Sequence, residues 1–217
     1  MKYIIMCGGK YPQWKTPRQL TQIRGEPIVA RTIRLLNLYE VNNTDIYISS
    51  DSKEFEHFGV QVLHHSNGFI ADRSLKTDWV DAFYPMDEPV CYLFGDVVFS
   101  PAAIGKIVCS DTNDILFFAS AYPFGKDYPK RWGEPFAFKV VNTEHFKQAI
   151  ADVKRLTLEG KFIRHTPIAW ELWNVIRRGP DGDLNSISIN SYIHINDYTC
   201  DIDGPEDVEL FERIVEK

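Results

Sequence analysis

The stretch YIIMCGGKYPQWKTPRQL, residues 3–20, sets the pattern for the chain. It begins with a short apolar run, which predicts a buried strand, and Gly8 and Gly9 follow at once. Glycines directly after a strand indicate a tight turn or a close approach of the backbone to another group. The next loop carries three basic residues: Lys10, Lys15 and Arg18. This loop could cradle a polyphosphate, and a tight turn with solvated lysines is the alternative.

Apolar runs and amphipathic segments alternate through about the first 120 residues. We expect strands at 3–7, 45–49, 60–64, 90–94 and 114–122, and helices at 27–39, 51–58, 74–84 and 101–109. After about residue 122 we expect a strand at 134–141, helices at 143–156 and 166–178, one or two strands in 186–197, and a helix at 205–217. Such alternation predicts a mostly parallel sheet covered on both faces. We therefore expect one α/β/α domain, residues 1–217, with a substrate-facing insertion between roughly 122 and 195.

The composition is that of an ordinary globular chain of 217 residues, with 44% hydrophobic residues. A net charge of -6 and a pI near 5.5 argue against a nucleic-acid or anionic-membrane surface. Four cysteines are far apart in the sequence: Cys7, Cys91, Cys109 and Cys200. We expect those beside apolar runs, Cys7, Cys91 and Cys109, to be buried thiols in a reducing compartment. The first apolar run is too short for a signal peptide or a membrane span, so the expected location is cytoplasmic.

The sequence has two acidic motifs that could bind a ligand. Asp96 follows a strand, and Asp201 and Asp203 precede the last helix. In open parallel sheets ligands bind at the carboxyl ends of the strands, and Asp96 ends a strongly apolar strand there. A poorly solvated carboxylate needs a partner, and a divalent metal is a natural one. Capping the helix that begins at Pro101 is the alternative role for Asp96. Asp201 and Asp203 alternate along an extended segment, so we expect at most one to face the site and the other to cap the final helix.

Two pairs of residues have plainer interpretations. Trp170 and Trp173 share one helix face, which favours a place in the core. His64 and His65 suggest a metal only weakly, because no third ligand accompanies them at a sensible spacing.

Taken together, the motifs resemble those of the sugar-nucleotide and alditol-phosphate nucleotidyltransferases. That family usually opens with LAAGxGxR followed by Pro-Lys, where this chain has MCGGKYPQWK and Thr16-Pro17-Arg18. Gly95-Asp96 aligns with the family's metal-bearing Gly-Asp, and Asp203-Gly204-Pro205-Glu206-Asp207 with its Asp-Thr-Pro-Glu-Asp. The segment ADRSL, residues 71–75, resembles a stretch near the nucleotide base. The order of the motifs is more specific than any one of them. Here the arginine of GxGxR is missing, and Arg18 replaces the usual lysine.

The resemblance implies a three-layer, Rossmann-like (GT-A-like) fold and transfer of a nucleoside monophosphate to a phosphorylated acceptor, with release of pyrophosphate. The implied catalytic residues are Arg18, Lys15 and Lys10. The implied nucleotide-binding residues are Cys7, Gly8, Gly9, Lys10, Arg73, Ser74 and Asp96. Asp96 and Asp203 are the implied Mg²⁺ ligands.

The middle of the chain should select the acceptor. The candidate acceptor-binding residues are Lys126, Lys130, Arg131, Trp132, Glu134, Arg164, His165 and Glu171. The variant GGK…TPRQL looks most like cytidylyltransferases of bacterial capsule or wall-polymer pathways, which implies CTP and a phosphorylated polyol such as a glycerol phosphate. Transfer from UTP or GTP to a sugar 1-phosphate, a GT-A glycosyltransferase using Asp201-Ile202-Asp203, and a non-catalytic nucleotide-binding protein are the alternatives. The sequence does not decide between a monomer and a homodimer.

Overall fold

A seven-stranded sheet forms the centre of the computed structural model, which describes residues 1–9, 14–65, 77–120 and 132–215. The strand order is β10-β8-β9-β6-β1-β4-β5. The strands are β1 (Lys2–Met6), β4 (Ile46–Ser50), β5 (Gln61–His64), β6 (Val90–Phe94), β8 (Ile115–Ser120), β9 (Pro135–Val140) and β10 (Ile193–Ile195). Within this sheet β9 runs antiparallel to β6 and β8, and the remaining pairs are parallel. The expected α/β fold with a mostly parallel sheet is confirmed.

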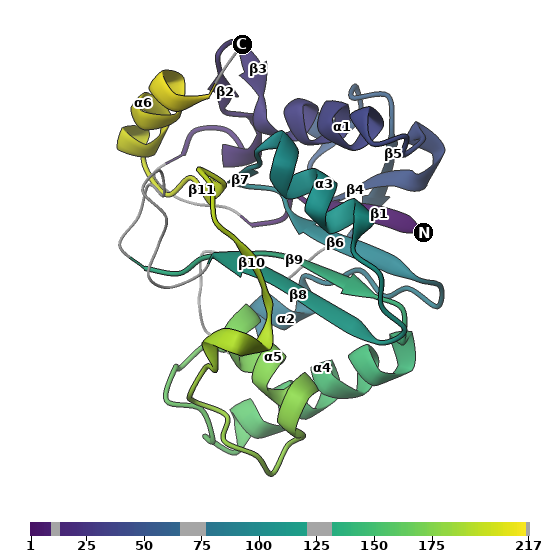
Figure 1. Ribbon diagram of the computed structural model, residues 1–217, viewed down its shortest axis with the longest axis vertical. Coiled ribbons are helices and arrows are strands. Elements are labelled where there is room, and N and C mark those ends of the chain that lie inside the picture. The colour runs from purple at the N-terminus through teal and green to yellow at the C-terminus, as the bar shows by residue number, and fades with distance from the viewer. Residues whose placement is uncertain (10–13, 66–76, 121–131, 216–217) are drawn as a thin grey trace.

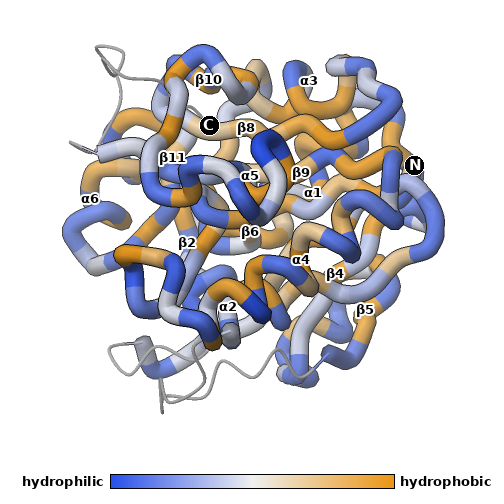
Figure 2. The backbone as a smooth tube through the Cα atoms, turned by 90° about the horizontal axis from the view of Figure 1, so that it is seen from below, coloured by the Kyte–Doolittle hydropathy of each residue, from blue (hydrophilic) through white to orange (hydrophobic). Residues whose placement is uncertain are grey.

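Helices cover both faces of the sheet, giving three layers (Figure 1). One face carries α1 (Ile28–Leu38) and α3 (Pro101–Cys109), and the other carries α2 (Asp78–Asp81), α4 (Thr143–Leu158) and α5 (Ala169–Arg178). None of the described helices is both long and apolar enough to cross a membrane. Hydrophobic stretches, orange in Figure 2, run through the strands and the inner sides of the helices. The apolar strand residues Ile4, Ile5, Phe117 and Phe138 are fully buried there, as the sequence pattern predicts.

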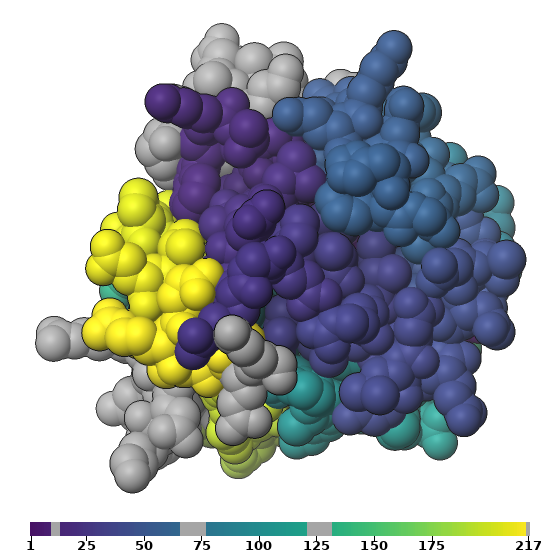
Figure 3. All heavy atoms as spheres, turned by 90° about the horizontal axis from the view of Figure 1, so that it is seen from above, coloured from purple at the N-terminus to yellow at the C-terminus, as the bar shows by residue number. Residues whose placement is uncertain are grey.

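The C-terminal segment packs against the N-terminal third of the chain. A hairpin of β2 (Gln22–Ile23) and β3 (Glu26–Pro27) lies beside α6 (Pro205–Ile214), and the short strand β11 (Cys200–Asp201) pairs with β7 (Val97–Val98). A separate cluster of buried apolar residues joins these elements: Ile23, Ile28, Val98, Cys200, Ile202, Phe211 and Val215. Figure 3 shows the yellow C-terminal residues directly against the purple N-terminal ones. This packing brings the last motif of the sequence to the first.

Three local expectations are wrong. The helix expected at 51–58 is one 3-10 turn, Lys53–Phe55, because only Phe55 of that segment is fully buried and a short polar helix has too little to stabilise it. The helix expected at 74–84 is limited to Asp78–Asp81 among the described residues. Cys109 is exposed at the end of α3, whereas Cys7 and Cys91 are buried as expected.

Candidate active site at the strand ends

Gly95 joins the first and second motifs by close backbone contact. Its N–H donates to the carbonyl oxygen of Met6 at 3.0 Å. A Cβ atom at Gly95 would lie 2.5 Å from that oxygen and 2.8 Å from Cys7 Sγ, closer than real Cβ atoms come. Glycine is therefore required here, because it lets β6 end directly against the end of β1. This contact sets Asp96 beside the Gly8-Gly9 turn, in which Gly9 has a φ of 94°.

Arg18 connects all three motifs. It begins a 3-10 turn, Arg18–Leu20, and its side chain is buried. Nη1 donates to the carbonyl oxygen of Ile202 at 3.0 Å and to Asp203 Oδ1 at 3.2 Å, and Nη2 is paired with Asp96 Oδ2. A planar guanidinium presents its donors in a fixed fork, so one side chain can reach two carboxylates at once. The predicted site residues Arg18, Asp96 and Asp203 are therefore in direct contact.

Strand pairing brings the C-terminal motif to Asp96. In the antiparallel pair of β7 and β11, Asp201 lies opposite Val97, and the N–H of Ile202 donates to the carbonyl oxygen of Asp96 at 3.1 Å. Neither Asp96 nor Asp203 caps a helix. Ser100 caps α3, with its Oγ accepting from the N–H of Ala103 at 2.9 Å.

The final helix is capped by a different carboxylate of the motif. Asp207 Oδ2 accepts from the N–H groups of Asp203 and Gly204, at 2.7 Å and 3.2 Å. This arrangement satisfies the start of α6 and lets the side chain of Asp203 face Arg18.

Three carboxylates gather beside Arg18. Glu134, Asp201 and Asp203 each offer an oxygen within 4.8 Å of the others. The expectation that Asp201 and Asp203 point to opposite sides is wrong, because the strand ends at Asp201 and the alternation ends with it. Hard carboxylate oxygens are the donors that Mg²⁺ prefers, so these three carboxylates fit a divalent cation. The predicted ligand Asp96 is not one of the three, and it is linked to Asp203 through Arg18. Among the described residues, no other group of three such ligands occurs.

A cavity of about 170 Å³ opens between these motifs. Its polar lining consists of Gly8, Gly9, Arg18, Gln19, Asp96, Glu134 and Asp201. Gln19 was not singled out from the sequence, although it follows Arg18 directly. It is buried, its Nε2 donates to the carbonyl oxygen of Gly8 at 3.3 Å, and its Oε1 has no hydrogen-bond partner among the residues that the structure describes. A buried acceptor of this kind marks a place where a ligand donor fits.

A second, larger cavity has a volume of about 660 Å³. Trp132 and Gly133, which directly precede Glu134 in the chain, are among the residues that line it. It is lined by Ser120, Trp132, Gly133, Arg164, Trp170, Glu171, Asn174, Asn185, Ile187, Ile189 and Tyr192. Three of the predicted acceptor-binding residues, Trp132, Arg164 and Glu171, thus line the same cavity. Arg164 Nε contacts Glu171 Oε1 at 3.3 Å, and Glu171 Oε2 accepts from the N–H of Ile168 at 2.9 Å, which caps α5. Trp170 lines this cavity, and Trp173 is buried in the core.

Two other predicted residues, Lys15 and Cys7, do not line the smaller cavity. Lys10, Arg73, Ser74, Lys126, Lys130 and Arg131 lie outside the described residues. Lys15 is exposed and does not line the smaller cavity. Cys7 is buried and does not line this cavity, and burial together with the charge of Asp96 raises the pKa of its thiol.

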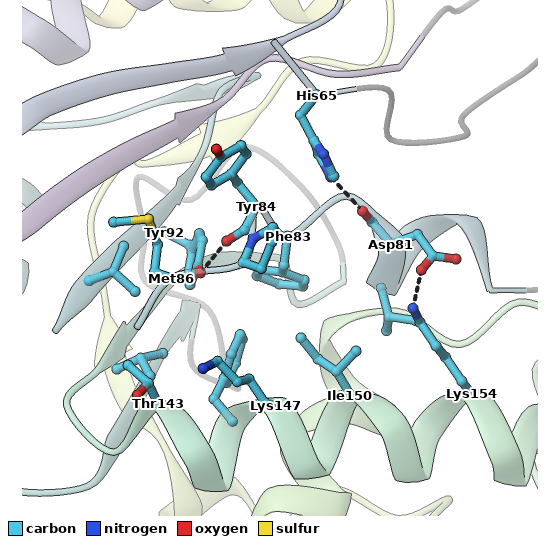
Figure 4. Close-up of a pocket in the computed structure, with 15 residues that line it drawn as sticks. His65, Asp81, Phe83, Tyr84, Met86, Tyr92, Thr143, Lys147, Ile150 and Lys154 are labelled. Carbon is cyan, nitrogen blue, oxygen red and sulfur yellow. Dashed lines mark hydrogen bonds and ion pairs between the residues drawn. The ribbon is translucent and has the colours of Figure 1, made fainter. Parts of the chain in front are cut away.

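A third cavity, of about 280 Å³, lies between α2, α4 and the sheet (Figure 4). Its lining is mostly apolar, with Lys147 and Lys154 from α4. His65 also lines it and bonds through Nε2 to the carbonyl oxygen of Asp81 at 2.8 Å, so this histidine has a structural partner. Neither Arg18 nor any of the four carboxylates described above lines this cavity.

No family model and no curated protein matches the sequence. Solved structures do match the fold. The inositol-1-phosphate CTP transferase from T. maritima superposes with a TM-score of 0.55 and 12% identity, covering 98% of this chain and 95% of the other. A protein from Bacillus anthracis described as a glucose-1-phosphate thymidylyltransferase, solved with sucrose, superposes with a TM-score of 0.51 and 16% identity. The match covers 100% of this chain and 96% of the other. A third structure, Rv0371c from Mycobacterium tuberculosis H37Rv, superposes with a TM-score of 0.54 and 14% identity. The match covers 99% of this chain and 98% of the other.

The chain has the nucleotidyltransferase fold. Because similarity at 12–16% identity reports fold and not activity, what this chain does has to be argued from its own site residues.

Proposed function

We propose that this protein is a nucleotidyltransferase that joins a nucleoside monophosphate, from CTP, to a phosphorylated polyol or sugar and releases pyrophosphate. The observation that carries the proposal is the contact of Arg18 with both Asp96 and Asp203. Residues from three distant motifs meet at the carboxyl ends of the strands, where ligands bind in open α/β sheets. The neighbouring structures described as CTP and thymidylyl transferases support the same reaction class.

The chemistry is an in-line displacement. An oxygen of the acceptor's phosphate attacks the α-phosphorus; a new P–O bond forms, the bond to the β-phosphate oxygen breaks, and pyrophosphate leaves. A phosphate is already ionised at neutral pH, so the protein must mainly position groups and neutralise charge. The backbone of Gly8 and Gly9 would face the β- and γ-phosphates with Lys10 and Lys15, and Arg18 would contact the α-phosphate.

Asp96 and Asp203 would hold Mg²⁺. When bound, the ion neutralises phosphate charge and helps to align the reacting oxygens. Glu134 and Asp201 are further oxygen donors beside Asp203. From the sequence, Glu134 is expected to bind the acceptor, and Asp201 to bind a metal only in the glycosyltransferase alternative.

We propose residues 122–195 as the acceptor-binding part of the molecule. The 660 Å³ cavity supports this, because aromatic and charged side chains are combined in it. Trp132 is 57% exposed and offers an apolar surface to the carbon-bound face of a polyol, while Arg164 could meet its phosphate. A role in bacterial surface polysaccharide synthesis rests on the resemblance of the GGK…TPRQL stretch.

A pyrophosphate assay tests the proposal. The protein is incubated with Mg²⁺, each nucleoside triphosphate in turn, and a panel of glycerol, ribitol, inositol and sugar phosphates. We expect pyrophosphate release with CTP and one acceptor. Pyrophosphate release only with UTP, TTP or GTP would instead indicate a sugar-1-phosphate nucleotidyltransferase. No release with any pair, together with hydrolysis of a nucleotide sugar, would favour a glycosyltransferase.

A further inference from the structure

The contacts of Arg18 define a cation site already filled by the protein. Its guanidinium lies between the carboxylates of Asp96 and Asp203 and also reaches the carbonyl oxygen of Ile202. The side chain of Arg18 is 8% exposed, that of Asp96 is 17% exposed and that of Asp203 is 52% exposed. The guanidinium is thus shielded from water and held by partners from two distant parts of the chain.

Two carboxylates brought together in this way repel each other unless a cation lies between them. In the structure that cation is the guanidinium. A divalent ion bound to the same two carboxylates would be repelled by it, because two positive charges cannot share partly buried oxygens at low cost. Arg18 and a divalent cation therefore compete for Asp96 and Asp203.

We propose that Arg18 is the internal counter-ion of the metal site and that a divalent cation binds Asp96 and Asp203 only as the guanidinium leaves them. The displaced guanidinium is then available to the phosphates of the nucleotide, and that last step rests on the proposed function. This role also explains an arginine at a position where the resembling family has lysine. An ammonium is a point charge, whereas the guanidinium fork bridges two carboxylates and a carbonyl oxygen.

Binding of Mn²⁺ in the absence of nucleotide tests this competition. Free Mn²⁺ is measured by electron paramagnetic resonance during titration of the wild-type protein, Arg18→Gln and Arg34→Gln. We expect Arg18→Gln to bind Mn²⁺ more tightly by about 5- to 150-fold, the usual range of coupling between two ligands. Arg34 forms an exposed pair with Glu26 away from the site, so Arg34→Gln should bind as the wild type does. Adding Asp96→Asn to Arg18→Gln should abolish the gain.

Thermal unfolding gives a second readout. Without divalent ions Arg18→Gln should melt below the wild type, and Mg²⁺ should raise its Tm more than it raises that of the wild type. Should Arg18→Gln not fold, Arg18→Lys should show a smaller gain in Mn²⁺ affinity, because lysine bridges the carboxylates less well.

Equal Mn²⁺ affinities in the variant and the wild type, including no binding by either, would overturn the proposal. So would a gain that survives Asp96→Asn. The proposed transferase activity can fail independently of this proposal. If Arg18→Gln binds Mn²⁺ more tightly but the wild type releases no pyrophosphate, the counter-ion role of Arg18 stands and the proposed nucleotidyl transfer is rejected.

Discussion

Asp96 is the residue on which the proposed chemistry depends most. Its carboxylate lies at the end of the central strand β6 and is paired with Arg18. Asp96→Asn keeps the shape but removes the charge, so we expect pyrophosphate release to fall by about 100-fold or more, as for loss of one group that stabilises transition-state charge. The matched control is Asp45→Asn. Asp45 forms an ion pair with Lys2 at the opposite end of the strands, and its replacement should keep the rate.

Stability separates this effect from unfolding. Asp96→Asn leaves Arg18 with Asp203 and the carbonyl oxygen of Ile202, so the free energy of unfolding should fall by about 1–3 kcal/mol. A normal rate in Asp96→Asn would remove this carboxylate from the mechanism.

Glu171 tests the acceptor cavity at the level of a single charge. Glu171→Gln retains an oxygen that can accept from the N–H of Ile168, so the cap of α5 is kept. The charge pair with Arg164 is lost. If the pair orients Arg164 for the acceptor's phosphate, the KM for the acceptor should rise about threefold to tenfold while the KM for the nucleotide stays the same, because one polar contact contributes about 1 kcal/mol. Equal changes in both KM values would place Glu171 outside the acceptor site.

The helix α3 depends on a buried lysine from a neighbouring strand. Lys139 of β9 is 5% exposed, and its Nζ donates to the carbonyl oxygens of Ile107, Val108 and Ser110, at 3.2, 2.8 and 2.6 Å. These carbonyls lie at the end of α3, where a helix has no internal donors and where a positive charge is favourable. Lys139 therefore fastens α3 to the sheet and holds the layer that contacts α1.

Lys139→Met should lower the free energy of unfolding by about 2–3 kcal/mol, because three carbonyl groups lose a charged donor. Urea unfolding measures this loss. Lys106→Met is the control: Lys106 is exposed and donates to the carbonyl oxygen of His194, so its loss should cost less than about 0.5 kcal/mol. Equal losses in the two variants would mean that burial of the lysine does not matter.

For the molecule as a whole, buried thiols and phenols make stability fall at alkaline pH. Burial raises the pKa of Cys91 from 9.0 to about 12, and that of Tyr3 from 10.0 to about 12. Above pH 9 the unfolded chain loses the Cys91 proton while the folded protein keeps it. The stability that Cys91 contributes is therefore fully present below pH 9 and decreases from there to about pH 12, by about 1.4 kcal/mol at pH 10.

Urea unfolding at pH 8 and pH 10 measures this decrease. Cys91→Ala should show a smaller loss between the two pH values than the wild type, by about 1.4 kcal/mol. Cys109→Ala, at the exposed cysteine, serves as control for removal of a thiol. The same pH dependence in Cys91→Ala and the wild type would contradict this account.

The sequence predicted the sheet, its layers and the three motifs at one edge, because apolar runs and glycine turns are local signals. It did not predict the meeting of Glu134 with Asp201 and Asp203, since that depends on a two-residue strand that ends the alternation. Lys139 and Gln19 were also missed. Lys139 is a polar residue between two apolar ones and Gln19 directly follows a charged one, and only the folded chain reveals the carbonyl groups that each of them contacts.

The fate of the α-phosphorus tests the central claim most directly. ³¹P NMR of a reaction with Mg²⁺, CTP and the acceptor identified by the pyrophosphate assay follows each phosphorus separately. The account predicts that the α-phosphorus appears in a new diphosphate bridge to the acceptor, in step with free pyrophosphate, and that Asp96→Asn stops both. Release of inorganic phosphate from the γ position, with no bridge formed, would contradict it.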